Sequence, residues 1–157
     1  MLQLVVRAIK IIALPILVGL LSALLISGST DLYNVLILPP FALPQWAFPI
    51  VWSIWYTAMG VSLYQYSRTA IPESEKKEGY VYFFTQLFLC FLWPILFFNL
   101  KLYFVAFIDL LLLFWFALRT VITFYRANRI SGLLLVPYLI FLVYAGYLNF
   151  AVWLLNM

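Results

Sequence analysis

The sequence predicts an all-α integral membrane protein, a five-transmembrane-helix bundle that forms a single membrane domain over residues 1–157. Composition is the first observation: 68% of the residues are hydrophobic and 9% are charged, whereas soluble domains are roughly half apolar and about a quarter charged. The second is that apolar stretches of about 20 residues, enough to cross a bilayer, recur along the chain. The third is that basic residues fall between alternate stretches. Together these observations exclude an ordinary soluble domain.

Five segments are long and apolar enough to cross a membrane. They cover approximately residues 5–26, 45–66, 80–98, 102–125 and 132–155. Pro15 predicts a kink in the first span, and Pro94 lies close to the end of the third. The first span is not expected to be a cleaved signal peptide, because the apolar run after Lys10 is too long and lacks a clear small-residue cleavage site.

The two loops beside the second span differ in character. The stretch from Arg68 to Lys77 is strongly polar, and its run from Pro72 onward is expected to be a solvated loop. The 27–44 loop ends instead in residues 38–44, an apolar segment with three prolines that cannot be helical. Irregular backbone persists at a membrane only where protein or trapped water satisfies it. This loop therefore either folds over one end of the bundle as a lid or forms a stiff interfacial linker.

The distribution of lysine and arginine predicts the orientation. With five spans, one side of the membrane holds eight basic residues: Arg7, Lys10, Arg68, Lys76, Lys77, Arg119, Arg126 and Arg129. The other side holds only Lys101. The positive-inside rule then places the N-terminus in the cytoplasm, and the C-terminus and the 27–44 loop on the extracytoplasmic side. The net charge of +4 is explained by topology and anionic lipid, so no nucleic-acid partner is predicted.

Aromatic residues recur at helical spacing in three of the spans. The shared faces hold Trp52, Tyr56 and Met59; Gln86, Cys90, Trp93 and Phe97; and Tyr138, Phe141, Ala145 and Leu148. Such stripes are typical either of a hydrophobic cavity between helices or of simple interhelical packing. Because aromatic residues make up 20% of the chain, spacing alone favours packing.

Polar and small residues inside the spans are expected to serve structure. Asp109 lies about 10 Å into the fourth span, where a carboxyl marks a functional or internally paired site. No basic residue shares its face, so we expect it to accept hydrogen bonds from a tyrosine, an asparagine or the backbone, rather than to carry protons. Asn149 is expected to link helices. The pairs Gly19 with Ala23 and Ala58 with Ser62 predict close helix approach, within the monomer or in a dimer.

The residues for several kinds of chemistry are missing. The chain contains no histidine and one cysteine, Cys90, which excludes histidine metal sites, an internal disulfide and a thiolate cluster. There is no acidic cluster for magnesium, no glycine-rich phosphate loop and no nucleophile with a histidine base. We therefore predict no catalytic residues, no metal site and no cofactor, and the sequence favours a binding protein over an enzyme.

Several runs of the sequence, taken in order, resemble the TspO/MBR family. They are residues 39–52, Tyr56 to Gly60, Gln86 with Trp93-Pro94 and Phe97-Phe98, Asp109 to Leu112, Pro137 to Leu139, and Leu148-Asn149. This is the family of the tryptophan-rich sensory proteins of bacteria and the mitochondrial translocator protein, or peripheral-type benzodiazepine receptor. The resemblance extends in one register from about Leu32 to Trp153.

The resemblance implies a five-helix bundle, often dimeric, with a ligand pocket beneath the loop that joins the first two helices. The ligands of the family are porphyrins, sterols and synthetic aromatic drugs. Its pocket positions correspond here to Tyr33, Phe41, Trp52, Cys90, Trp93, Phe141, Ala145 and Leu148. This set overlaps the aromatic faces described above, which favours the pocket over packing alone.

The chain departs from the family pattern at several of these positions. Leu32, Phe41 and Phe141 stand where family members usually carry tryptophan, and Cys90 replaces a usual asparagine. Residues 148–154 lack the tyrosine and the following basic residue of the C-terminal sterol motif. These departures suggest a divergent member whose ligand can differ from that of its relatives.

The sequence thus predicts a membrane receptor or transporter-like protein that binds a hydrophobic small molecule, a porphyrin or other tetrapyrrole, between helices under the 27–44 loop. Sterol binding through the C-terminal motif is not expected. Two alternatives stay open: light-dependent breakdown of porphyrin, in which pocket tryptophans take part, and a regulatory or structural subunit whose pocket holds lipid. A homodimer is compatible with each of them.

Overall fold

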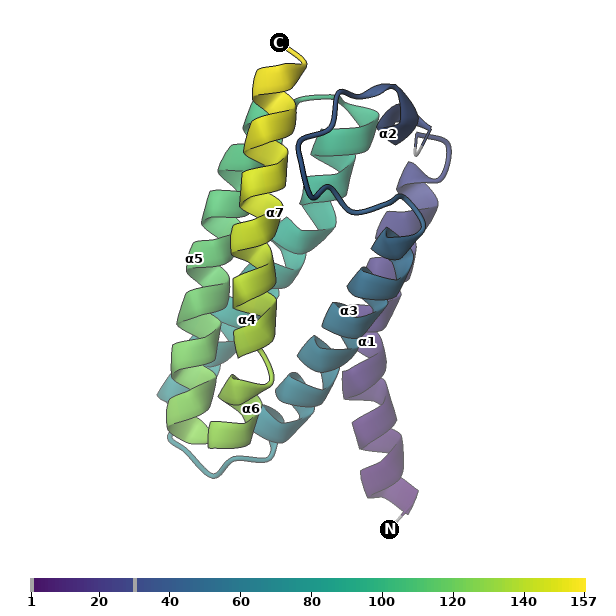
Figure 1. Ribbon diagram of the computed structural model, residues 1–157. Helices are drawn as coiled ribbons and strands as arrows, with labels where there is room; N and C mark the ends of the chain where they lie inside the picture. The colour runs from purple at the N-terminus through teal and green to yellow at the C-terminus, as the bar shows by residue number, and fades with distance from the viewer. Residues whose placement is uncertain (1, 30) are drawn as a thin grey trace.

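The structure is a computed structural model that describes residues 2–29 and 31–157 (Figure 1). Five long helices dominate the described residues: α1 (Leu2–Ile26), α3 (Ala47–Ser67), α4 (Glu73–Pro94), α5 (Tyr103–Ala127) and α7 (Val136–Leu155). Three short elements accompany them: α2 (Leu32–Val35), the π-helical turn η1 (Ile95–Asn99) that continues α4, and α6 (Arg129–Leu133). The all-α class is confirmed.

In the part of the chain that the structure describes, four helical stretches are long and apolar enough to cross a membrane. They are Gln3–Ile26, Glu73–Asn99, Tyr103–Ala127 and Arg129–Leu155. Helix α3, with 21 residues, is long enough but is not among them. Hydroxyl and amide residues such as Ser53, Thr57 and Gln65 lower its hydropathy. The structure therefore supports a multi-span membrane protein, and the fifth crossing stays a prediction.

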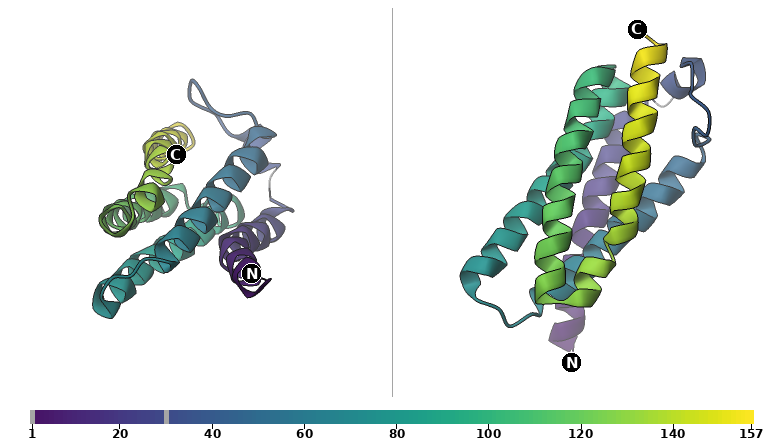
Figure 2. Two further views of the ribbon diagram at one scale, coloured as in Figure 1. Left: turned by 90° about the horizontal axis from the view of Figure 1, so that it is seen from below. Right: turned by 60° about the vertical axis from the view of Figure 1, so that its left-hand side comes forward.

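The long helices form an elongated bundle with the chain termini at opposite ends (Figure 1). Helix α1 packs against α3 and α4, and α5 packs against α4 and α7. Seen along the bundle, α1 and α7 lie on opposite sides of α3 (Figure 2). The loop between α2 and α3 lies at the same end as the C-terminus (Figure 1).

Helix α4 begins earlier than predicted, so the expectation of a solvated loop through Lys77 was wrong. The helix starts at Glu73, after Pro72, and carries two carboxylates in its first turn. Proline before the first turn and acidic residues within it both favour a helix start. The hydroxyl of Tyr66 on α3 donates to the carbonyl of Glu75 at 3.1 Å, which holds this turn against the bundle. The helix therefore extends beyond its apolar part.

The last span is also divided differently from the prediction. A short helix, α6, precedes α7, and the side chain of Asn128 caps it by accepting from the Ser131 amide at 3.1 Å. Ser62 of α3 and Ser131 of α6 exchange two hydrogen bonds, each 2.7 Å, from hydroxyl to carbonyl. These bonds fix α6 beside α3. Helix α7 then starts with Pro137 in its first turn, where the missing N–H has no consequence.

Two buried contacts join the long helices, one between α4, α5 and α7 and the other between α3 and α5. Near the C-terminal end of the bundle, the Asn149 side chain accepts from the Trp93 indole at 2.8 Å and donates to the Tyr103 carbonyl at 2.7 Å. The prediction that Asn149 links helices is confirmed. At the other end, the rings of Tyr66 and Phe124 stack with centroids 3.9 Å apart. Both contacts lie in the buried interior.

The loop that follows α2 folds over the end of the bundle, as a lid would. Tyr144 of α7 donates its hydroxyl to the Phe41 carbonyl at 2.6 Å. The side chain of Asn156 accepts from the amide of Ile37 and donates to its carbonyl, both at 3.0 Å. Tyr33 donates to the Leu43 carbonyl at 2.6 Å. These bonds satisfy irregular backbone that would otherwise be costly at a membrane.

Candidate ligand site

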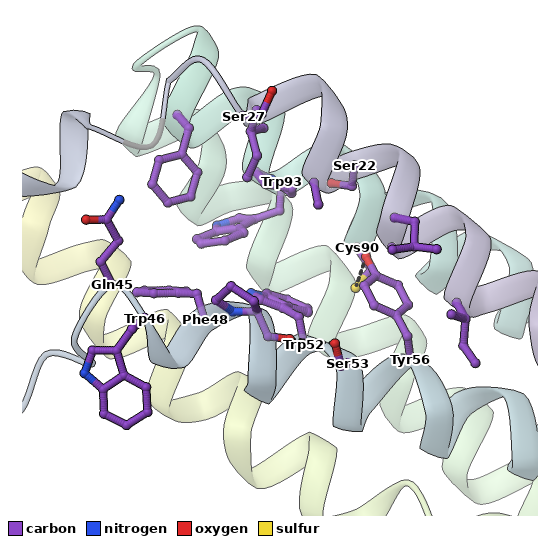
Figure 3. Close-up of a pocket in the computed structure, with 18 of the residues that line it drawn as sticks. Ser22, Ser27, Gln45, Trp46, Phe48, Trp52, Ser53, Tyr56, Cys90 and Trp93 are labelled. Atoms are coloured by element: carbon purple, nitrogen blue, oxygen red, sulfur yellow. Dashed lines mark hydrogen bonds between the residues drawn. The ribbon is translucent and has the colours of Figure 1, made fainter.

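A cavity of about 820 Å³ opens between α1, α3 and α4 (Figure 3). We call it the α1 cavity. Its volume lies within the range of about 300–1,000 Å³ that is typical of small-molecule sites. Gln45 and Trp46 lie at one end of the view, and Cys90 and Tyr56 lie toward the other (Figure 3). The cavity therefore runs from the loop end of the bundle into its interior.

Aromatic rings form one wall of the α1 cavity. The rings of Trp52 on α3 and Trp93 on α4 lie 5.9 Å apart and are tilted by 34°. Phe48 and Phe98 continue the wall, with ring centroids 6.5 Å apart. Aromatic faces at this spacing cover a flat apolar molecule well, because ring pairs favour offset or edge contacts at about 4.5–7 Å.

Small residues on α1 leave the space that the cavity occupies. Gly19, Ser22 and Ala23 face the wall of rings. Gly19 lies against the ring of Tyr56, which a Cβ atom at this position would overlap. Nearer the N-terminus, the backbone of Ile12 approaches Gly60 of α3 so closely that a side chain on Gly60 would overlap it. Helix α1 thus touches α3 at one end, and the cavity opens toward the other.

The hydroxyl groups of the cavity are largely engaged within their own helix. Ser53 donates to the Pro49 carbonyl and Thr57 to the Ser53 carbonyl, both at 2.7 Å. Such bonds leave little donor capacity for a ligand, so the walls behave as an apolar surface. Tyr33 lies at the loop end of the cavity. Burial, and to a smaller extent Tyr144, raises the pKa of its phenol above the ordinary value of 10.0. Its hydroxyl therefore stays neutral at neutral pH and keeps its hydrogen bond to the Leu43 carbonyl.

A second, much smaller cavity of about 30 Å³ lies under the loop, between α3, α4 and α7. Trp52, Trp93 and Phe48 line both cavities, so the same rings separate them. On the α7 side Phe141 fills the space, with its ring 5.9 Å from that of Trp52. We call this space the α7 cavity.

The predicted ligand-binding residues divide between the two cavities. Tyr33, Trp52 and Trp93 line both. Cys90 lines only the α1 cavity, whereas three others line only the α7 cavity: Phe141, Ala145 and Leu148.

Phe41 lines neither cavity. Its side chain is 86% exposed, and its backbone has a positive φ of 65°. The loop reverses direction at this residue and turns the ring outward, while the carbonyl bonds to Tyr144. The position therefore contributes its backbone to the lid.

Sequence reasoning missed the contribution of α1 to the site. Gly19 and Ala23 were interpreted as a packing pair. Gly19 does pack closely against the Tyr56 ring of α3, but both residues also line the α1 cavity. A pair of small residues facing a tryptophan-rich helix indicates either close packing or a cavity. Only the position of α1 relative to α3 distinguishes the two.

Asp109 also differs from expectation. Its side chain is 4% exposed, yet its Oδ2 atom has no hydrogen-bond partner among the described residues. The expected tyrosine, asparagine or backbone donor to this oxygen is absent from that part of the chain, so the prediction of a structural acceptor was wrong. The hydroxyl of Tyr138, a buried tyrosine on α7, instead donates to Cys90 at 3.8 Å.

The described residues contain no group of three or more cysteine, aspartate or glutamate side chains that could hold a metal ion. The polar cluster nearest the α1 cavity consists of Tyr56, Cys90 and Tyr138, in which Cys90 Sγ lies 3.5 Å from the Tyr56 hydroxyl. The α1 cavity thus has one aromatic wall and one wall of small residues.

Fold and site together define a class: α-helical membrane proteins with an aromatic-lined cavity between their helices. The model of the TspO/MBR family matches residues 11–154, and the chain belongs to this family.

Three relatives illustrate the range of the family. The tryptophan-rich protein TspO of Chlorobaculum tepidum is 34% identical over 154 residues, covering 94% of this chain and 98% of its own. The translocator protein of Bos taurus is 34% identical over 156 residues, with 94% and 89% covered. Protein CrtK of Rhodobacter capsulatus is 34% identical over 124 residues, with 79% and 78% covered. The bacterial and mammalian relatives are thus similar to this chain to the same degree.

Proposed function

We propose that this protein binds a flat, hydrophobic small molecule of the tetrapyrrole class, and that the α1 cavity is the binding site. The observation that carries the proposal is the pair of indole rings, Trp52 and Trp93, on the wall of a cavity of about 820 Å³. The ring of a porphyrin presents a large apolar face, which such rings can cover. Its carboxylates would point toward the wet end of the cavity, near Tyr33 and Gln45.

The chain offers no group that would favour a metalloporphyrin. Histidine is absent, and Cys90, the single thiol, is fully buried and bonded to Tyr56. An iron atom would therefore gain no histidine ligand, and the Cys90 thiol is already engaged in a hydrogen bond. We expect free-base porphyrin and haem to bind with similar affinity.

The test is a titration of the purified protein in nanodiscs with free-base protoporphyrin in the dark, followed by tryptophan fluorescence. We expect saturable quenching at micromolar concentrations, reduced in Trp52→Phe. Trp115 is 56% exposed and lines neither cavity, so Trp115→Phe is the matched control and should change affinity little. Absence of saturable binding, or equal binding by wild type and Trp52→Phe, would refute the proposal and leave a lipid-filled pocket as the better interpretation.

A second candidate function is light-driven breakdown of the bound porphyrin. It is favoured by the direct exposure of two indole rings to the cavity, because an indole gives up an electron more readily than a phenyl ring. Illumination of the saturated complex distinguishes the two functions. Loss of porphyrin absorbance that depends on Trp52 or Trp93 supports breakdown, and stable absorbance supports binding alone.

We further propose that all five long helices cross the membrane, with the N-terminus in the cytoplasm. Chain termini at opposite ends of the bundle support an odd number of crossings, and the positive-inside rule supports the direction. In a Cys90→Ala background, a thiol reagent should label Ser74→Cys only from the cytoplasmic side and Ser29→Cys only from outside. Labelling of both from one side would disprove this topology.

A further inference from the structure

Three side chains in the described part of the chain have buried polar atoms without a hydrogen-bond partner. They are the indole nitrogen of Trp55, both amide atoms of Gln86, and Oδ2 of Asp109. Gln86 is 0% exposed and Asp109 is 4% exposed. A buried polar group without a partner costs roughly 1–3 kcal/mol, and more if charged. Such groups call for a ligand or ordered water.

The three groups come from three helices, and each is related to one hydrogen bond, between Tyr138 and Cys90. The ring of Trp55 on α3 lies 5.9 Å from that of Tyr138 on α7. Tyr138 donates its hydroxyl to Cys90 on α4, and Gln86 lies one turn before Cys90 on the same helical face. Asp109 of α5 is close enough to interact electrostatically with both Cys90 and Tyr138. The bond between Cys90 and Tyr138 is thus the centre of the group.

The register of the helices agrees with this placement. Asn149 bridges the Trp93 indole and the Tyr103 carbonyl, so these two residues lie at one level. Asp109 is six residues beyond Tyr103 on α5, which is about 9 Å along the helix. Helix α4 runs in the opposite direction, and a position about 9 Å before Trp93 on it lies between Gln86 and Cys90. Asp109 therefore faces the stretch of α4 that carries the unpartnered amide.

Among the described residues, Asp109 has no ion-pair partner, because the one salt bridge there joins Arg119 to Glu78. The nearest basic residue on its own helix is Arg119, ten residues or about 15 Å away, and its guanidinium contacts Glu78 and Tyr82. The groups that face Asp109 from the packed helices, Cys90 and Tyr138, are uncharged donors and acceptors. The carboxyl must therefore be satisfied by something small and polar.

We propose that Trp55, Gln86 and Asp109 bind ordered water inside the bundle, next to the α1 cavity. The three groups supply what a buried water needs: a donor from the indole, an acceptor from the carboxyl, and both from the amide. Tyr56 and Cys90, which line the α1 cavity, separate the water from it. The inference is independent of the identity of the ligand.

The test uses the indole protons of Trp55 and Trp93 as a matched pair, observed by NMR in protein labelled with ¹⁵N-tryptophan and held in nanodiscs. The Trp93 indole donates to Asn149, whereas that of Trp55 has no protein acceptor. We expect a magnetisation-transfer signal from water to the Trp55 indole and none to Trp93, with assignments from Trp55→Phe and Trp93→Phe. A Trp55 indole as isolated from water as that of Trp93 would overturn the proposal.

A variant tests whether the water depends on the other two groups. Replacing Asp109 with leucine removes the acceptor and fills the space, so the water signal at Trp55 should disappear while the Trp93 signal keeps its position. If Asp109→Leu does not fold, Gln86→Leu provides the same test. Persistence of the water signal in a folded variant would show that these residues do not hold the water, and the proposal would fail.

Discussion

The two sides of the Trp52–Trp93 wall face very different surroundings. Toward α1 the wall meets glycine, serine and alanine, and about 820 Å³ stays open. Toward α7 it meets Phe141, Tyr144 and Leu148, and about 30 Å³ remains. The same two indole rings thus border open space on one side and pack into the core on the other. The difference shows that the helix opposite an aromatic stripe, rather than the stripe itself, decides between pocket and packing.

The loop makes this contrast sharper. It is bonded to α7 through Tyr144 and Asn156, so it closes the α7 side. The α1 side has instead an entrance near Trp46, a residue that is 71% exposed. We therefore predict that a ligand enters between the loop and α1, and that substitutions on the two sides of the wall have unequal effects on ligand affinity.

The largest effect is expected from filling the α1 cavity. Ala23→Trp would place an indole in the space that the ligand needs, and porphyrin affinity should fall at least about tenfold, or about 1.4 kcal/mol. The neighbouring Leu24 is 71% exposed and lines neither cavity. Leu24→Trp is therefore the control and should bind like the wild type. Equal binding by both variants, measured by titration in nanodiscs, would remove the α1 cavity from consideration.

A smaller effect is expected from restoring tryptophan at two of the three positions where the family usually has it. Phe141→Trp adds area to a packed ring that touches Trp52, so it should change ligand affinity by no more than about 1 kcal/mol. Phe41→Trp lies outside both cavities and should have no effect on affinity or on quenching. A marked gain from Phe41→Trp would indicate that the loop closes over the ligand in another conformation.

The bonds between loop and helix predict a local change in stability. Tyr144→Phe removes the 2.6 Å bond to the Phe41 carbonyl and should weaken loop closure by about 1 kcal/mol. Hydrogen exchange of residues 37–43 should become faster by several fold. Tyr147→Phe removes only a 3.5 Å contact with Pro40 and should have a smaller effect. If both variants exchange like the wild type, the loop is not held from α7.

The smallest effect concerns Tyr33 at alkaline pH. Burial raises the pKa of Tyr33 in the folded state above its ordinary value of 10.0. Its contribution to stability is therefore fully present below that value and is lost as the pH rises through the raised value, when its hydroxyl no longer donates to Leu43. The unfolding temperature should fall less between pH 9 and 11 in Tyr33→Phe than in the wild type. An identical pH dependence would contradict this role.

The sequence predicted the long helices because their apolar runs match the thickness of a bilayer. It failed where an element continues past the apolar part, as α4 does at Glu73, because charge at a helix start resembles charge in a loop. The same ambiguity affected the site. Trp52 and Trp93 follow from helical spacing, but the open space beside Ala23 depends on how far α1 stands from α3, which no local pattern encodes.

Phe41 and Asp109 show two further limits. The direction of the Phe41 side chain depends on a single backbone reversal, which an apolar, proline-rich segment does not reveal. For Asp109, depth in the span predicted burial correctly. Whether Asp109 finds a donor depends on whether the Tyr138 hydroxyl donates to it or to Cys90. Side-chain packing across three helices decides this choice, and the sequence does not reveal it.

Protection of engineered thiols tests most directly whether the ligand occupies the α1 side of the wall. In a Cys90→Ala background, Ser53→Cys reports on the α1 cavity and Leu148→Cys on the α7 cavity, since each of these positions lines only one of them. The account predicts that saturating free-base porphyrin slows alkylation of Cys at position 53 about tenfold or more and leaves position 148 unchanged. Protection at position 148 with none at position 53 would place the ligand under the loop and contradict the account.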